Sequence, residues 1–464
     1  MNAAGEFHVS AANARPAQPT SWLATGVAIL AVASIVAPKC LHTLVPLLLS
    51  LLIATRNVSI FPPQSVRTLL LRCSLNPLIW LLAGFLILRA ATSPEPLHAF
   101  KTIMIAAAYG AMAVLIMRLV RKRDSFDMGL IRRALVISVF VGAAYIVFEL
   151  LNGLSLMTGA LNDVPWLAGG NKLHFIISGE TIEAVRAYVL NRNVAVLNFL
   201  FWPALLIAVR DRRFWSAEAA RWVVPSLCVV VAAATFLSYH DASKVALIAS
   251  AAIYGVSRYS PRLARMAVTA AWVAASIAVV PVVMYSYAHG LQNSEAIPGS
   301  ARARVVLWNY EAEQIPAHAL FGKGIDSVRY YDELEGPSAE TIPGEVSPQR
   351  NGRHSHNVFL QVWYEFGLVG VALFMSAGLL AIRRISRVNA EDLPFVNASF
   401  VTCMTIASFS WGMWQTWYIA AVCLAASAIA ISLRKSNFAP LFVAVRLRNV
   451  SGRGRAPTLA LGEN

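Results

Sequence analysis

The chain alternates long apolar runs with short polar links over most of its length. A transmembrane α-helix needs roughly 20 consecutive apolar residues, and about twelve runs approach that length. Each run is continuously apolar and does not alternate with polar residues, so the strands of a membrane barrel are not expected. The runs lie near residues 22–38, 40–55, 75–92, 101–120, 134–152, 193–209, 222–239, 243–257, 266–288, 357–381, 395–410 and 414–433.

This pattern predicts an all-α fold, a polytopic transmembrane helical bundle of about twelve spans with a large outer loop before the tenth. The first two runs are separated by little more than Pro38-Lys39, so we expect a hairpin or a partly re-entrant pair there. The expected organisation is a disordered N-terminus at 1–20, spans one to nine at 21–290, an outer loop at 291–355, spans ten to twelve at 356–433 and a basic tail at 434–464.

Composition supports a membrane protein, since 57% of the 464 residues are hydrophobic, 14% are charged and the mean hydropathy is +0.59. Positive charge then predicts the orientation, because Lys and Arg gather on cytoplasmic loops. With the N-terminus inside, 26 of the 39 Lys and Arg residues fall on cytoplasmic segments, which puts both termini inside and segments 153–192 and 289–356 outside. The net charge of +15 is mainly this topology signal. It suits anionic lipids of the bilayer, and no nucleic-acid partner is expected.

The two long outer segments differ in character. Within 153–192, the polar piece 178–186 is expected to form a short helix along the membrane interface. The segment ends near Arg192, which is either a phosphate or sugar ligand or an anchor that snorkels to the interface. In the second segment, residues 300–319 read as an amphipathic helix. The acidic stretch after it reads as a loop that rearranges over a substrate.

The second segment ends with two histidines before the next apolar run, His354 and His356. Histidine suits base catalysis near neutral pH, because its ordinary pKa is about 6.5. We interpret His356 as the general base, with a helix cap as the alternative, and His354 as a second candidate with a supporting or binding role as its alternative. Asn357 follows, and it shares one helical face with Gln361 and Glu365 four and eight residues later. Polar side chains on one face of a membrane helix usually face a cavity or the bundle interior.

Cationic side chains suggest the partner of this base. Arg302 and Arg304 open the second outer segment, and a guanidinium group suits a pyrophosphate because it makes paired, charge-assisted hydrogen bonds. Arg304 either contacts a phosphate or forms a salt bridge with Glu311 or Glu313. Lys244, in the short outer link near 238–244, either pairs with Asp241 or serves a substrate anion. No metal-ligand spacing is present, so a metal-independent reaction without a cofactor is expected.

These residues resemble the O-antigen ligase and polymerase family of bacterial envelope enzymes. That family shows an Arg before a Trp, a Pro, a Gly-x-Gly turn, a His-Asn-x-x-Leu-Gln helix start and a Glu-x-Gly-Leu-x-Gly element. The match spans about 300–370 and is specific as an ensemble. The corresponding residues here are Arg304, Trp308, Pro316, Gly322-Lys323-Gly324, His356 to Gln361, and Glu365 to Gly370.

The resemblance implies a glycosyltransferase of the bacterial inner membrane with an undecaprenyl-diphosphate-linked glycan as donor. The acceptor would be another glycan or a lipid A core on the periplasmic side, with other polysaccharide-assembly proteins as possible partners. By the resemblance, His356 is the base and Arg304 holds the pyrophosphate. A second family Arg lies in a Ser-Arg-Gly element, but this chain has Ser243-Lys244-Val245 there, so Lys244 takes that role only if Lys replaces the Arg fork.

The resemblance does not separate a polymerase from a ligase, and we favour polysaccharide polymerisation because nothing looks dedicated to a protein acceptor. The competing class is a transporter or flippase for lipid-linked oligosaccharides. Transporters tend to carry inverted repeats, and none is visible here.

Overall fold

The computed structural model describes residues 20–55, 77–121, 125–164, 175–178, 181–211, 215–335 and 353–433. The N-terminus, expected to be disordered, and the basic tail lie outside the described residues. So does most of the acidic stretch after the amphipathic helix, at 336–352.

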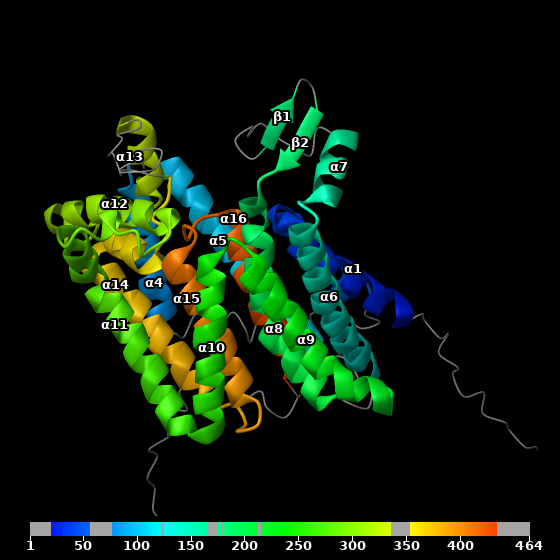
Figure 1. The fold of residues 1–464 in the computed structure, drawn as a ribbon. Coiled ribbons are helices and arrows are strands. Elements are labelled where there is room, and N and C mark those ends of the chain that lie inside the picture. The colour runs from blue at the N-terminus through cyan, green and yellow to red at the C-terminus, as the bar shows by residue number, and fades with distance from the viewer. Residues whose placement is uncertain are drawn as a thin grey trace, which may run out of the picture.

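The described chain is built almost wholly of helices, and each apolar run predicted from the sequence coincides with one of them (Figure 1). These helices are α1 (Thr20–Val36), α2 (Leu41–Ala54), α4 (Pro77–Ala91), α5 (Pro96–Arg121), α6 (Ser125–Leu151), α8 (Asn191–Arg210), α9 (Ala217–Leu237), α10 (Asp241–Tyr259), α11 (Pro261–Ala288), α14 (Val358–Ile385), α15 (Leu393–Phe409) and α16 (Thr416–Ser432).

The helical, membrane-type fold class is confirmed, whereas the number of spans is not. Among the described residues, five helices are long and apolar enough to cross a membrane, namely α5, α6, α8, α11 and α14. A sixth span results if α1 and α2 count as one, because together they are long and apolar enough to cross a membrane. They are bent by 119° at their junction. The 3-10 turn Pro38–Cys40 forms this junction. Such a bend belongs to a broken span or a re-entrant loop, and the second of these is an arrangement expected from the sequence.

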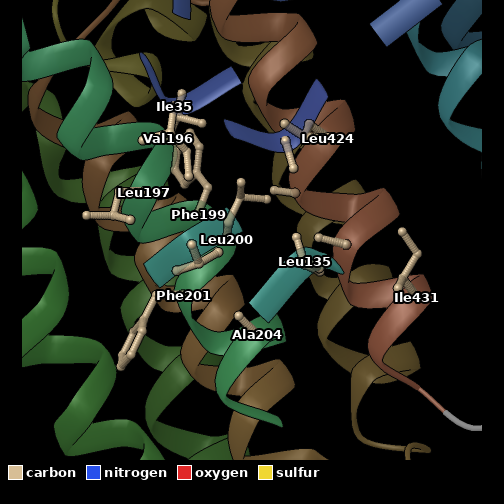
Figure 2. Close-up of a cluster of buried hydrophobic side chains, with 14 of the residues drawn as sticks. Ile35, Leu135, Val196, Leu197, Phe199, Leu200, Phe201, Ala204, Leu424 and Ile431 are labelled. Carbon is tan, nitrogen blue, oxygen red and sulfur yellow. The ribbon is translucent and has the colours of Figure 1, made fainter. Parts of the chain in front are cut away.

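Helix α8 occupies the centre of the bundle. Nearly all of its side chains between Asn193 and Ala208 are buried. It packs against α6, α9, α15 and α16. Figure 2 shows Phe199 and Leu200 of α8 among Ile35, Leu135 and Leu424 from three other helices. Because α8 is apolar all round, its first residues are held firmly at the end of the bundle where the outer segments lie.

The outer segments gather at one end of the bundle, where Figure 1 places α7 (Ser155–Asp163), the β1–β2 hairpin, α12 (Gly299–Gln314) and α13 (Ser327–Glu335). The prediction of an interfacial helix at 178–186 is wrong, because β1 (Phe175–Ser178) and β2 (Thr181–Val185) pair antiparallel instead. Isoleucine and valine favour strands, and Ile182, Ala184 and their neighbours alternate in burial. The side-chain amide of Asn162 fixes the hairpin to α7 by exchanging two hydrogen bonds with the backbone of Ile182, at 2.9 and 2.8 Å.

The helix predicted at 300–319 is confirmed as α12, followed by a 3-10 turn at Pro316–His318. Its predicted amphipathic character is wrong, because the buried residues of α12 do not keep to one face and include Asn309 and Glu311. Part of the acidic stretch predicted as a loop forms α13 instead.

The Gly322-Lys323-Gly324 turn docks onto a break in α14. Helix α14 breaks at Gly367, which has φ of +60°, so the carbonyls of Tyr364 and Glu365 lose their helical partners. They accept hydrogen bonds from the N–H groups of Lys323 and Gly324 at 2.8 and 3.0 Å. In return, the N–H of Leu368 donates to the carbonyl of Ala319 at 2.8 Å. This exchange ties the outer segment to the start of α14 and explains why both elements need glycine.

Replacing Gly322 by Ala tests this docking. A Cβ at Gly322 would lie 2.3 Å from the backbone of Glu365, at φ of +71°. Gly153→Ala is a matched control, because Gly153 has φ of +61° but open space around it. We expect the control to cost about 1 kcal/mol from backbone strain alone, and Gly322→Ala to cost several-fold more. Thermal melting of the purified variants measures both, and equal losses would contradict the docking.

Candidate functional site

A cavity of about 190 Å³ lies at this end of the bundle and draws its lining from six separated parts of the chain. It brings together Arg192, from the end of the first outer segment, with Arg304 and His356, from the second. Sequence analysis had not proposed the remaining lining residues for the site, namely Lys39, Tyr188, Val189, Asn191, His240, Ser410 and Trp411.

His356 sits in a strained turn at the cavity wall. Its φ of +53° lies in the left-handed region, which a side chain other than glycine rarely adopts. Its Nδ1 donates a hydrogen bond to the carbonyl of Ser410, in the loop between α15 and α16. A carbonyl only accepts, so Nδ1 carries the proton and Nε2 keeps its lone pair. Burial, with the charges of His354 and Arg304, lowers the pKa of His356 to about 3, so the ring is neutral at neutral pH.

Hydrogen bonds from the side chains of Trp308 and Asn357 hold the backbone on either side of His356. The indole of Trp308 donates to the carbonyl of Ser355 at 2.6 Å, and Asn357 caps α14 by accepting from the N–H groups of Phe359 and Leu360. Asn357 does not line the cavity, so its side chain supports the helix start. Glu311 lies fully buried near Ser355, and burial raises its pKa to about 8 although the nearby Ser355 hydroxyl partly opposes the shift.

Two guanidinium groups line the cavity. Burial lowers the pKa of Arg304, and the charge of Asp241 partly opposes this. Among the described residues, no ion pair joins Arg304 to Glu311 or Glu313, the salt-bridge alternative raised by the sequence. Arg192 lies at the first turn of α8, with its guanidinium 5.4 Å from the ring centre of Trp417. Both side chains are therefore available to an anion in the cavity.

His240 is a site residue that the sequence reasoning missed. It is buried in the link between α9 and α10, and its two ring nitrogens contact the hydroxyls of Ser243 at 2.6 Å and Ser410 at 3.0 Å. It stacks on Trp411 with ring centres 4.8 Å apart. Burial, with the charges of Arg304 and Lys244, lowers its pKa to about 3. Its position in the short link 238–244, four residues before Lys244, was the feature of the sequence that could have suggested it.

Two predicted ligands lie outside the cavity lining. Lys244 makes an ion pair with Asp241 at 3.0 Å, which was its alternative role. Arg302, two residues before Arg304 on α12, is also absent from the lining. His354 lies beside His356, with ring centres 4.3 Å apart, and its ring nitrogens contact the amide of Gln415. The structure thus gathers three of the seven predicted site residues around one cavity, and places His354 next to it.

The polar face of α14 points into the protein interior, as predicted. Gln361 donates to Glu365 at 2.7 Å, and both side chains are buried. Gln361 also accepts from the N–H of Met413 at 2.9 Å, and Glu365 accepts from the indole of Trp414 at 2.6 Å. This face therefore holds the loop between α15 and α16, which in turn holds His356. Within the described residues, no group of three or more His, Cys, Asp or Glu side chains is arranged to hold a metal.

Comparison with known proteins finds one matching family. Residues 226–375, from within α9 into α14, match the family described as O-antigen ligase. The matched segment contains His240, Arg304 and His356, whereas Lys39, Arg192 and Ser410 lie outside it. The resemblance seen in the sequence is thereby confirmed.

Several relatives carry the name polysaccharide ligase. A Rickettsia bellii protein is 22% identical over 237 residues, which cover 50% of this chain and 55% of that protein. A Rickettsia typhi protein is 23% identical over 234 residues, covering 50% and 56%. A Rickettsia conorii protein is 27% identical over 128 residues, covering 26% and 29%. The chain thus spans about half the length of the first two relatives.

The buried histidines predict a loss of stability in acid. In the unfolded chain a histidine binds a proton below about pH 6.5, whereas His240 in the folded state resists protonation down to about pH 3. The unfolded state therefore binds more protons between these values, and stability falls as pH falls through that window, by up to about 1.4 kcal/mol per pH unit for each such group.

Melting temperatures at pH 7.5 and 5.5 measure this effect. His240→Gln removes the titrating ring, so we expect its melting temperature to fall less with acid than that of the wild type. His289→Gln is the matched control at an exposed position and is expected to behave as the wild type. An identical acid response in all three proteins would refute the assignment to His240.

Proposed function

Through residues 226–375 the chain belongs to the O-antigen ligase family, and on this premise we propose that it transfers glycan from a lipid diphosphate to an acceptor hydroxyl. The proposed donor is an undecaprenyl-diphosphate-linked glycan. The proposed acceptor is the end of another glycan or a lipid A core. The name polysaccharide ligase carried by the relatives and the membrane-type helices of the fold support this class of reaction.

One observation carries the proposal, namely the charge of the cavity beside His356. Its described lining includes three cationic side chains, Lys39, Arg192 and Arg304, and no carboxylate. Lys39 is exposed, whereas Arg192 and Arg304 are partly buried, and buried cationic groups are costly unless an anion joins them. A diphosphate meets this need, because each guanidinium can bind two of its oxygens and remains ionised.

The reaction is a single displacement at the anomeric carbon of the donor. The acceptor oxygen forms the new glycosidic bond as the bond between the anomeric carbon and the diphosphate oxygen breaks. His356 takes the acceptor proton on Nε2, whose lone pair is free because Nδ1 donates to Ser410. The negative charge that develops on the departing diphosphate is stabilised by Arg304, with Arg192 and Lys39 around it. Inversion at the anomeric carbon follows from one displacement.

The low pKa of His356 has a role in this scheme. Burial and neighbouring positive charge keep the ring neutral before the donor binds, so it is ready to accept a proton. The bound diphosphate brings negative charge beside the ring, and an opposite charge nearby favours the protonated form. Donor binding therefore raises the basicity of His356 at the step that needs it. His354 supports the ring of His356, and Asn357 the start of the helix behind it.

The orientation of the site follows from the charge distribution along the chain. We place both termini in the cytoplasm and the cavity on the periplasmic side of a bacterial inner membrane. No nucleotide sugar is available there, so a preformed lipid-linked donor fits that location. We retain polysaccharide polymerisation as the favoured form of the transfer, and the acceptor used in the experiment below distinguishes it from ligation to lipid A core.

The test is transfer by purified protein in lipid, with an undecaprenyl-diphosphate oligosaccharide as donor. We expect His356→Ala to lower the rate at least 100-fold, as loss of a general base does. We expect Arg304→Ala to lower it similarly, and Arg304→Lys to recover only part of the rate because a point charge replaces the fork. Product on the lipid diphosphate indicates a polymerase, and product on lipid A core indicates a ligase.

Arg258→Ala is the control, since Arg258 is an exposed arginine at the opposite end of α10 from His240. It is expected to keep the wild-type rate. Full activity of correctly folded His356→Ala and Arg304→Ala would refute the site. Vesicle translocation of the lipid without transfer to any acceptor would replace the enzyme by a flippase.

A further inference from the structure

A second cavity, of about 380 Å³, adjoins the histidine pair and has no role in the mechanism above. His354 lines this second cavity and His356 lines the first, and the two rings lie 4.3 Å apart. The two cavities share none of their described lining residues. The imidazole pair therefore stands where the two cavities meet.

The charge of the second cavity differs from that of the first. Asp326 is in its wall and interacts with His98 at 2.8 Å and with Arg329 at 3.2 Å. Arg329 also pairs with Glu333 at 2.8 Å and with Glu95, so carboxylates surround its guanidinium. Lys101 and Arg353 are also in the lining, so positive and negative groups are mixed there. Arg329 is the third cation of this lining, but it is already paired with carboxylates. A diphosphate therefore gains less here than in the first cavity, whose described lining holds no carboxylate.

The remaining lining is of the kind that recognises sugars. The amides of Gln361 and Gln415 lie in the wall and are held in place by hydrogen bonds within the protein, Gln361 to Glu365 and Gln415 to His354, and amides can both donate and accept further hydrogen bonds. Trp414 offers an aromatic ring on which the apolar face of a sugar can pack. Sugar hydroxyls also donate and accept, so they match a wall of mixed polarity and little net charge. A pocket with a few convergent polar groups and an aromatic surface is the usual form of a small-molecule site.

We propose that this second cavity binds the terminal sugar of the acceptor glycan. The inference rests on the proposed function and adds the place from which the acceptor enters. A displacement needs the attacking oxygen and the leaving group on opposite sides of the anomeric carbon. A diphosphate in the first cavity and an acceptor sugar in the second satisfy this condition, with the imidazole of His356 between them to take the proton.

The constellation of His98, Asp326 and Arg329 links the second cavity to the outer segment. His98 is at the start of α5, whereas Asp326 precedes α13 and has φ of +55°, a conformation unusual for aspartate. The hydroxyl of Ser93 accepts from the N–H of Ile325 at 2.8 Å, next to Asp326. The wall is thus assembled across α5 and the outer segment, and His98 is accessible at its edge with 38% of its side chain exposed.

The experiment measures the KM for the acceptor and the Kd for the donor separately in the variant His98→Ala. Lys101→Ala is a second variant should the first fail to fold. The probe is a short reducing-end-labelled oligosaccharide of the donor's own repeat for the polymerase arm, and O-antigen-free lipid A core for the ligase arm. We expect the KM for the acceptor to rise about tenfold, as the loss of one good polar contact would give. We expect kcat and the Kd for the lipid-diphosphate donor to stay within twofold of the wild type.

His289→Ala is the matched control, because His289 lines neither of these cavities. It should leave all three constants unchanged. An unchanged KM for the acceptor in both cavity variants, or an equal weakening of donor binding, would overturn the proposal.

Failure of the proposed function is recognised separately. If the wild type transfers nothing, binding of the labelled oligosaccharide in the absence of donor tests whether the second cavity is a saccharide site. Binding that His98→Ala weakens would keep the second cavity as a saccharide site, whereas absent binding, or binding that the substitution leaves unchanged, would reject it.

Discussion

The net positive charge of the first cavity is the constraint on which the site depends. Lys39, Arg192 and Arg304 line one space at the end of an apolar bundle, and no carboxylate is among the described lining residues. Removing charges from water without a partner is costly, so the surrounding fold must hold them in place. The buried helix α8 carries Arg192, and α12 carries Arg304. An anionic ligand would relieve this cost.

The loop between α15 and α16 joins the parts of the site. Ser410 contacts His240 through its hydroxyl and His356 through its carbonyl. Further along, Met413 and Trp414 bind the polar face of α14, and Gln415 contacts His354. One short loop thus sets the tautomer of His356 and the position of its neighbour. The strained backbone of His356 is consistent with this role, because such a conformation persists only when its surroundings fix it from several sides.

The sequence predicted the helices well because bilayer-length apolar runs leave one solution for the backbone. It also singled out Arg192, Arg304 and His356, because a base and guanidinium groups on the long polar segments suit an anionic substrate. It missed Lys39, His240 and Ser410, because their value comes from convergence of segments far apart in the chain. The sequence did not predict the β1–β2 hairpin, because a segment of nine mixed polar and apolar residues fits both the helical period of about 3.6 and the strand period of about 2. The Gly322-Lys323-Gly324 turn was visible, but its docking on α14 depends on the break at Gly367.

An experimental structure with undecaprenyl diphosphate bound tests the central claim most directly. The account predicts the diphosphate in the first cavity, with its oxygens within hydrogen-bond distance of Arg304 and Arg192. A diphosphate bound beside His98 and Asp326, or outside both cavities, would contradict it.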